Sequence, residues 1–262
     1  MLKRIQKYIS GIFLFHFIAF NLFSQGEISE QPRIFYRNER SVGVLLNSNG
    51  LGVNGRYANR INARKKTIWE LDFVGIKHPK EYKYSNPYNS NRRFVFGKLN
   101  SFFDLRVGYG KQKEMFKKVD KGGISIRRYF SFGPTLGILK PIYYEVLQYT
   151  SPQSEPYLIT EKFVTHLNQQ FIWGKASFFK GINEISVVPG GYGRFGFSFE
   201  YSRSDITLHA IETGLILDIF PKKIPIMDTE ENNFLFLTLF ISYRFGRVVD
   251  ASGVIDEKEL MY

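Results

Sequence analysis

Hydrophobic and polar residues alternate along much of the chain. The alternation is clearest at residues 195–201, where Phe-Gly-Phe-Ser-Phe-Glu-Tyr puts aromatic rings at odd positions and small, polar or charged residues between them. Successive side chains of a β-strand point to opposite faces. This segment therefore predicts a strand with one bulky apolar face and one polar face. Repeated strands of this kind are typical of a wall between lipid and a polar interior, which favours a membrane β-barrel.

The same alternation, together with turn signals, predicts nine strands. Asn49-Gly50 marks a tight hairpin, because Asn and Gly both tolerate positive φ. Pro141 demotes part of its strand to an edge or a bulge. The predicted strands are residues 41–47, 51–58, 69–73, 94–110, 123–130, 135–147, 193–201, 206–220 and 234–245.

Barrels of this type have an even number of strands. Either one predicted strand is false, or residues 171–188 supply a tenth; the alternative for this segment is to fold into the lumen. We expect an all-β fold, an antiparallel transmembrane β-barrel of eight to ten strands. The rival fold is an exported β-sandwich, whose apolar face is buried and which needs fewer aromatic residues along every strand.

Polar segments between the predicted strands indicate connections of unequal length. Residues 79–93 form a long loop rich in Asn and Tyr, which suits the outward side of an outer-membrane barrel. Residues 131–134 are expected to join two strands, and residues 111–121 to form a charged connection. Residues 150–170 hold a loop or a short helix.

The N-terminus has the pattern of a signal peptide. Lys3, Arg4 and Lys7 precede an apolar run at residues 9–23, and Ser24 offers a small residue at a cleavage point. An uncleaved anchor helix is the alternative, but the run is shorter than the roughly 20 residues that a spanning helix needs. The expected organisation is a signal peptide at 1–24, a periplasmic lead-in at 25–40, the outer-membrane barrel at 41–247 and a polar tail at 248–262.

Composition supports this organisation. Aromatic residues make up 17% of the 262 residues, while the mean hydropathy of −0.21 argues against a helical membrane bundle. The chain has no cysteine, which excludes thiolate catalysis and cysteine-bound metals. The net charge is +12. For a barrel, this charge favours lipid phosphates over nucleic acid as partners; a solvated basic rim is the equally simple alternative.

Charged residues of both signs fall on the polar faces of the predicted strands. The lumen of so small a barrel is filled by side chains, and unpaired buried charge is unfavourable. We therefore expect a lumen plugged by ion pairs, the alternative being a charged permeation path. The expected network consists of Glu70, Asp72, Asp104, Arg106, Arg127, Glu145, Arg194, Glu200, Glu212, Asp218 and Arg244, with Arg56 on the same face.

Catalytic and metal-binding patterns are weak. His209 lies near Ser202, Ser204 and Glu212 in sequence, but no nucleophile elbow accompanies it. The histidines of the mature chain are scattered without metal-ligand spacing. Residues 190–193 are Gly-rich but precede a strand, so a bulge or a tight entry into the strand is a better interpretation than a phosphate loop. We expect no enzymatic activity, no metal and no cofactor.

Several segments resemble those of an uncharacterised family of outer-membrane β-barrel proteins from Bacteroidota. They are residues 96–103, 137–144, 195–200, 220–227 and 242–246, and the Ser24-Gln25 junction is similar to export signals of that group. The resemblance implies the outer membrane as location and a barrel as fold, and it carries over no functional residue. Residues 220–227 are expected to be a stiff connector or a periplasmic docking element.

The leading hypothesis is a non-enzymatic barrel with a structural or interaction role in the cell envelope. Its partners would be outer-membrane lipid, and either lipopolysaccharide phosphates or an envelope protein complex. Tyrosine is favoured at interfaces. The predicted contact residues are Tyr82, Tyr84, Tyr88, Lys222 and Lys223. The alternatives are a narrow pore for small solutes and a lipid-modifying enzyme centred on His209.

Overall fold

The computed structural model describes residues 38–86, 89–120, 122–150, 155–165, 167–204, 206–229 and 231–249. The predicted signal peptide lies outside these residues, as do most of the expected lead-in and tail, and Tyr88 and His166. Among the described residues, no helix is both long enough and apolar enough to cross a membrane.

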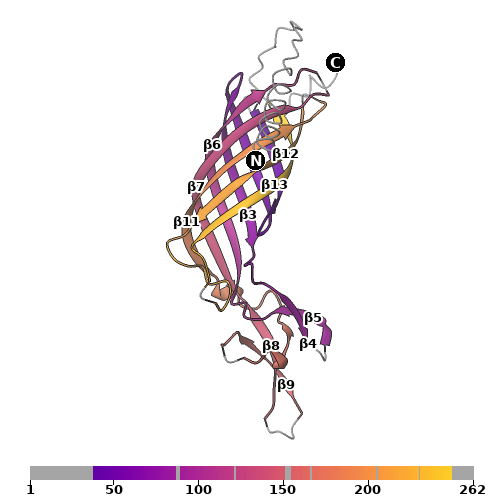
Figure 1. Cartoon of the computed structure of the whole chain (residues 1–262), viewed down its shortest axis with the longest axis vertical. Helices are drawn as coiled ribbons and strands as arrows, with labels where there is room; N and C mark the ends of the chain where they lie inside the picture. The colour runs from indigo at the N-terminus through magenta and orange to yellow at the C-terminus, as the bar shows by residue number, and fades with distance from the viewer. Residues whose placement is uncertain are drawn as a thin grey trace, which may run out of the picture. The chain divides into compact units, whose positions relative to one another are not determined.

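Eight antiparallel strands form a closed barrel (Figure 1). Each barrel strand pairs with the next one along the chain, and β1 pairs with β13 from Asn38↔Val249 to Asn47↔Phe240 to close the ring. The closed ladder leaves no sheet edge in the wall. The barrel strands are β1 (Asn38–Asn47), β2 (Gly50–Asn62), β3 (Lys65–Ile76), β6 (Asn100–Phe116), β7 (Ser125–Pro141), β11 (Ser186–Glu200), β12 (Thr207–Ile219) and β13 (Leu235–Val249).

The prediction of two strands at 123–130 and 135–147 is wrong, because β7 runs without a turn through residues 131–134. Pairing with β11 is continuous there, including Gly191↔Pro134. Pairing with β6 lapses opposite Gly133 and Pro134 and resumes in the same register. Proline has no N–H to donate to a ladder, so the local break reflects Pro134 and not a chain reversal. The nine predicted strands thus become eight.

Two other boundaries differ from the prediction. Residues 171–188 do not add a tenth barrel strand: they hold β10 (Ile172–Lys175), the 3-10 helix η2 (Ile182–Glu184) and the start of β11. Of these elements, β11 contributes Val188 to the interior apolar cluster. The Gly-rich residues 190–193 lie inside β11, where a Cβ on Gly190 would meet the Ile219 carbonyl oxygen at 2.5 Å. Glycine is therefore required by close strand packing. The charged residues 111–116 extend β6.

The connections differ sharply between the two ends of the barrel. We call the end where β1 begins and β13 ends the terminal end, and the opposite one the loop end. Residues 63–64, 117–124 and 201–206 join strands at the terminal end. At the loop end, a two-residue turn at 48–49 accompanies the much longer connections 77–99, 142–185 and 220–234.

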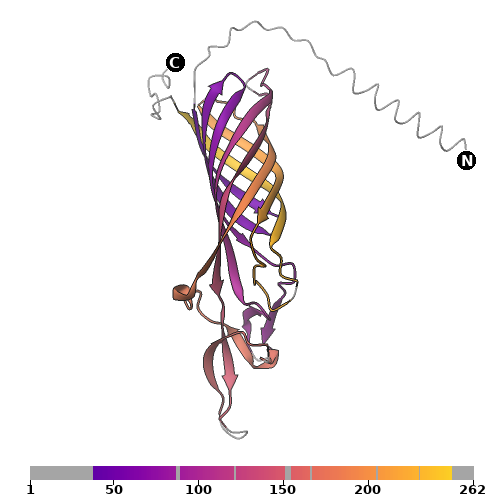
Figure 2. The ribbon, with the colours of Figure 1, turned by 90° about the vertical axis from the view of Figure 1, so that its left-hand side faces the viewer.

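The long connections build a second structure, the extension, beyond the loop end (Figure 2). It contains β4 (Lys83–Asn86), β5 (Asn89–Val95), β8 (Tyr143–Gln148), β9 (Tyr157–Lys162), β10 and the 3-10 helix η1 (Gln169–Phe171). The strands form one sheet in the order β10-β8-β9 and a β4-β5 pair. Phe94, Ile142, Tyr144, Val146 and Ile172 make its apolar core. The extension therefore has a folded core of its own.

Candidate functional site

The barrel wall has an apolar outer face. Along β11, Phe195 and Phe197 point outward and are 46% and 38% exposed, while Gly196 and Ser198 between them are buried. The same holds in β13, where Leu237, Leu239 and Ile241 are exposed while Thr238, Phe240 and Ser242 are not. The predicted alternation is thus the alternation of the wall: its outer face carries exposed rings and aliphatic chains, and its inner face carries the polar groups together with some buried apolar side chains.

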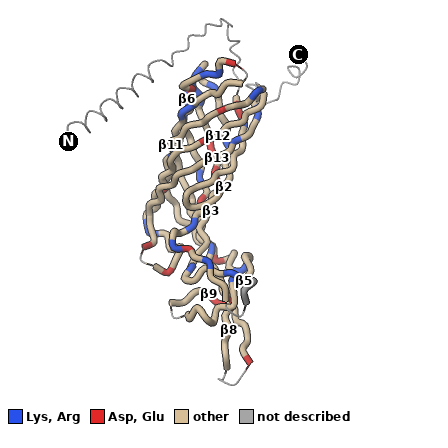
Figure 3. Tube along the Cα trace, turned by 45° about the vertical axis from the view of Figure 1, so that its right-hand side comes forward, with Lys and Arg blue, Asp and Glu red and all other residues tan. Residues whose placement is uncertain are grey.

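The centre of the barrel interior is an ion-paired network, and Figure 3 shows charges of both signs along the barrel strands. Arg56 lies between Glu70 and Glu212, with nitrogen–oxygen distances of 2.6 Å to each. Tyr129 donates a hydrogen bond of 3.1 Å to Glu212, and its ring lies 4.3 Å from the Arg56 guanidinium carbon. Ser131 donates to Glu70 at 2.5 Å. Charged groups from β2, β3 and β12 are thereby joined across the lumen.

Two further arginines extend this network. Arg194 of β11 pairs with Asp72 and, at 3.3 Å, with Glu70. Arg244 of β13 lies 3.2 Å from Glu212 and donates to Ser41 at 3.1 Å. The Arg194, Glu70 and Asp72 side chains are completely buried. Charged groups at such depth are stable only with partners, which these contacts supply.

A second group of charges lies toward the loop end. Arg106 binds both carboxylate oxygens of Asp218, at 2.7 and 2.8 Å, and lies 2.9 Å from Asp104. Such two-point guanidinium–carboxylate pairs fix orientation as well as charge. Arg106 therefore ties β6 to β12 across the interior.

A third group closes the terminal end. Arg127 pairs with Glu39 at 3.2 Å and with Glu200. Lys66 also pairs with Glu39, and Lys118 lies 2.9 Å from Glu200. Glu39 and Lys66 are absent from the predicted network, because Glu39 precedes the predicted first strand and Lys66 lies between the predicted strands 51–58 and 69–73. Period-two extension of the Ser41 face would have found Glu39.

Glu145 is a correction to the predicted network. The structure places the other ten predicted residues inside the barrel, but Glu145 lies in β8 of the extension and pairs with Arg92. The chain leaves the barrel sheet after Pro141, where β7 ends. The alternation that continues into β8 consequently belongs to another sheet.

Residues 220–227 close the loop end of the barrel. Ile224 and Ile226 are completely buried, together with Phe220 and Met227, in one cluster with inward residues such as Phe102 and Ile216. We call these four residues of the segment the apolar plug. The segment belongs to the connection between β12 and β13, and its apolar side chains fill the loop end of the barrel.

One asparagine side chain holds the apolar plug in place. Asn232 accepts hydrogen bonds from the Ile226 and Met227 amides at 3.1 and 3.2 Å, and it donates to the Met227 and Thr229 carbonyls at 2.7 Å each. The Leu99 amide also donates to the Ile226 carbonyl at 2.9 Å. These bonds satisfy backbone groups that the plug takes out of water. The interior is thus filled by ion pairs and then covered by apolar side chains.

Buried polar groups tie connection 77–99 to β8 of the extension. Tyr144 donates to the Val95 and Lys98 carbonyls at 2.6 and 2.8 Å, and burial raises the pKa of its hydroxyl. Lys98 lies 2.5 Å from Glu81; burial lowers the pKa of Lys98, and the Glu81 carboxylate opposes this shift. The segment before β6 and the segment after β7 are therefore held together by specific contacts.

The His209 hypothesis lacks its geometry. The His209 ring lies on the outward side of β12, where its Nδ1 is 3.0 Å from the Tyr243 hydroxyl. Glu212 lies on the opposite, inward face. The histidine and the carboxylate are therefore separated by the barrel wall. No group of three or more His, Asp or Glu side chains that could hold a metal occurs among the described residues.

The predicted contact residues lie at the loop end. Tyr82 and Tyr84 are 65% and 41% exposed, and Lys222 and Lys223 are also exposed. Tyr88 lies outside the described residues. The predicted contact residues do not include the other large exposed side chains of the extension, among them Tyr157, Leu158, Phe178 and Phe179. The sequence could have indicated these residues, because they are apolar residues in segments where the alternation of the barrel strands is interrupted.

Comparison with known proteins finds barrels of low similarity. No family model matches the chain, and no curated protein matches it. Among solved structures, Ail of Yersinia pestis, in complex with the heparin analogue sucrose octasulfate, has 9% identity and a TM-score of 0.40, over 82% of this chain and 99% of Ail. Neisserial surface protein A has 10% identity and a TM-score of 0.35, over 80% and 95%. The N-terminal β-barrel domain of Pseudomonas aeruginosa OprF has 7% identity and a TM-score of 0.33, over 82% and 98%. At these values, the fold is stated from the strand pairing of this chain alone.

Proposed function

We propose that the chain is a bacterial outer-membrane β-barrel with a non-enzymatic structural or interaction role in the cell envelope. The observation that carries this proposal is the contrast between a sealed interior and an exposed, folded extension. Buried ion pairs and the apolar plug occupy the lumen. Because the lumen is occupied, we infer that partners bind to the exposed surface of the extension.

The membrane location is supported by the wall itself. Leu237, Leu239 and Ile241 are among many large apolar side chains that the closed barrel exposes outward. A soluble monomer rarely exposes so continuous an apolar surface. Outer-membrane barrels have short periplasmic turns and longer outward loops, so the extension would face the cell exterior. The resemblance to a Bacteroidota family and the cleaved signal peptide are part of the same proposal.

The partner would contact the extension. Tyr82, Tyr157 and Phe179 are exposed aromatic residues there, and aromatic anchors often dominate binding. Lys222 and Lys223 add positive charge at the same end, which suits lipopolysaccharide phosphates or an acidic face of an envelope protein. The described core of the extension would present these groups in a fixed arrangement.

Site-specific photocrosslinking in intact cells tests this role. A photoreactive residue at Tyr82 or Phe179 should give one discrete adduct, which mass spectrometry identifies as protein or lipopolysaccharide. The matched control is Arg203, which is exposed in a terminal-end turn. The proposal fails if both extension sites give no adduct, or if Arg203 gives the same one.

A further inference from the structure

The outer wall near the terminal end is hollowed. A depression of about 1100 Å³ lies over β1, β2, β3 and β13. Its lining includes Val42, Leu71 and Phe245, which are all exposed. The depression is therefore a mainly apolar feature of the outer wall. The inward residues Ser41, Arg56 and Glu70 also border it, at the strand positions between the outward ones.

Gly55 explains the hollow. It occupies an outward position on β2, between Val42 of β1 and Leu71 of β3 in the strand register. A Cβ added to Gly55 would meet only the Leu71 carbonyl oxygen, at 3.9 Å. The missing side chain consequently leaves an open groove between two aliphatic side chains, and a larger residue fits there without displacing the backbone.

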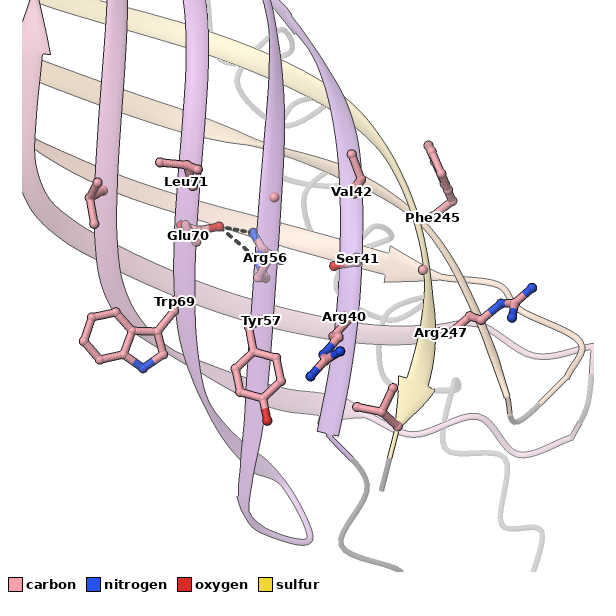
Figure 4. Close-up of a pocket in the computed structure, with 14 residues that line it drawn as sticks. Arg40, Ser41, Val42, Arg56, Tyr57, Trp69, Glu70, Leu71, Phe245 and Arg247 are labelled. Atoms are coloured by element: carbon pink, nitrogen blue, oxygen red, sulfur yellow. Dashed lines mark hydrogen bonds and ion pairs between the residues drawn. The ribbon is translucent and has the colours of Figure 1, made fainter. Parts of the chain in front are cut away.

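Two arginines stand at the terminal end of this groove. Arg40 and Arg247 are direct register partners across β1 and β13, and both are exposed. Figure 4 shows them beyond Val42 and Phe245 toward the strand ends, while Glu70 and Arg56 pair on the inner side. Like charges directly opposite each other on a sheet are unfavourable. Among the described residues, neither arginine has a carboxylate within ion-pair distance.

Along both strands, the charged residues and then the apolar residues follow the same order as the phosphate and the acyl chain of a phospholipid. Along β1 the sequence from the terminal end is Arg40 and then Val42, and along β13 it is Arg247 and then Phe245. Paired guanidinium groups recognise a phosphate by charge and by parallel hydrogen bonds. The aliphatic groove that follows suits an acyl chain. Tyr57, whose ring lies 5.8 Å from the Arg40 guanidinium carbon, is of the kind found at membrane interfaces.

We propose that this groove binds one anionic glycerophospholipid, with its phosphate between Arg40 and Arg247 and an acyl chain along Gly55. The lipid would come from the leaflet that surrounds the terminal end. It would neutralise the opposed arginines and fill the hollow. This proposal rests on the membrane placement proposed above, but it adds a defined lipid site that the placement does not require.

Lipid titration by native mass spectrometry tests the site in the full folded chain. The probes are phosphatidylglycerol and phosphatidylcholine with identical acyl chains. Because charged hydrogen bonds are strong, we expect one phosphatidylglycerol to bind at least about tenfold more tightly than phosphatidylcholine. Arg40→Ala/Arg247→Ala should lower that affinity at least about tenfold. Arg40→Gln/Arg247→Gln, which keeps polar side chains, serves as the second variant if the first folds poorly.

Two matched variants separate a groove from a general basic surface. Gly55→Leu keeps every charge but obstructs the groove between Val42 and Leu71, so it should also reduce phosphatidylglycerol binding. Lys65→Ala/Lys113→Ala removes two exposed outward cations at the same end, outside the groove lining, and should leave binding nearly unchanged. Equal loss in the lysine variant, full binding by Gly55→Leu, or no preference in the unmodified protein would overturn the proposal.

Flotation with phospholipid vesicles distinguishes failure of the lipid-site proposal from failure of the proposed membrane location. A folded barrel that does not float with vesicles contradicts the proposed location. A barrel that floats but shows no preference for phosphatidylglycerol contradicts the groove site alone.

Discussion

The barrel interior and the extension use charge in opposite ways. Inside the barrel, Arg194 has two carboxylate partners and no contact with solvent. In the extension, Arg92 pairs with Glu145, and about half of the Arg92 side chain remains exposed. The apolar groups are reversed as well, since the extension exposes Tyr82 and Phe179. The interior is therefore arranged for stability, whereas the extension keeps its large side chains available for contact.

The largest effect should follow from breaking the central network. Arg194→Ala removes the close cation of buried Asp72 and leaves Glu70 with Arg56 alone, so we expect a loss of about 3–5 kcal/mol in the free energy of unfolding. Urea unfolding in phospholipid vesicles, followed by tryptophan fluorescence, measures it. A loss below about 1 kcal/mol, as for a surface pair, would contradict the buried network.

Loss of a plug side chain should come next. Ile226→Ala removes buried aliphatic volume at the loop end, and it should destabilise the barrel by about 2–4 kcal/mol. Leu237→Ala is the matched control, because Leu237 is 64% exposed on the outer wall. In detergent micelles, equal destabilisation by the two variants would argue against a packed plug.

A smaller effect is expected at the residue that holds the plug. Asn232→Ala leaves the buried Ile226 and Met227 amides without their acceptor, which should destabilise by about 1–3 kcal/mol. Hydrogen exchange at these two amides should accelerate, while exchange in β2 should not. Unchanged exchange at both amides would show that Asn232 does not hold the plug.

Breaking the exposed ion pair of the extension should change stability least among these substitutions. Arg92→Ala should lower the free energy of unfolding by about 1 kcal/mol or less, since exposed pairs are screened by solvent. Arg194→Ala, measured in the same urea assay, is the matched comparison because both variants replace an arginine by alanine. Similar losses from both would erase the distinction between the two regions.

Lowering the pH should weaken one local contact beside β9, the contact of Glu184 with Lys162 and Tyr143. The Lys162 ammonium and the Tyr143 hydroxyl hold the pKa of the Glu184 carboxyl below its ordinary value. The depressed pKa means that this contact stabilises the fold above about pH 4.5 and is lost as the pH falls through the lower folded pKa. NMR of the Tyr143 ring should report the change at acidic pH, and Glu184→Gln should abolish it.

The barrel could be predicted further than the extension for a physical reason. Residues such as Glu70 and Asp104 repeat every second position opposite apolar residues, so their inward placement follows from strand geometry. The same period cannot tell which sheet a strand joins, and Glu145 was misassigned for this reason. It also cannot show that Ile224 and Ile226 turn back into the barrel mouth, because that contact joins segments far apart in the chain.

The sequence also could not predict which inward side chains pair with each other across the barrel. The hairpin at Asn49-Gly50 fixed one local register, but Arg106 and Asp218 meet only because the barrel closes. Pro134 misled the strand count, since a proline in a strand can signal a turn or a local gap in one ladder. The closed barrel shows that the local gap is correct, because every strand in it must pair with a neighbour on each side.

Single-channel recording in planar bilayers tests the sealed interior most directly. Purified full-length barrel, with insertion verified by protease protection, should give no large, steady open current. Ile226→Asp, which puts a charge into the apolar plug, gives a matched measurement of whether the loop end contributes to the seal. Large, steady currents from the unmodified protein would contradict the ion-paired, plugged lumen and favour a pore.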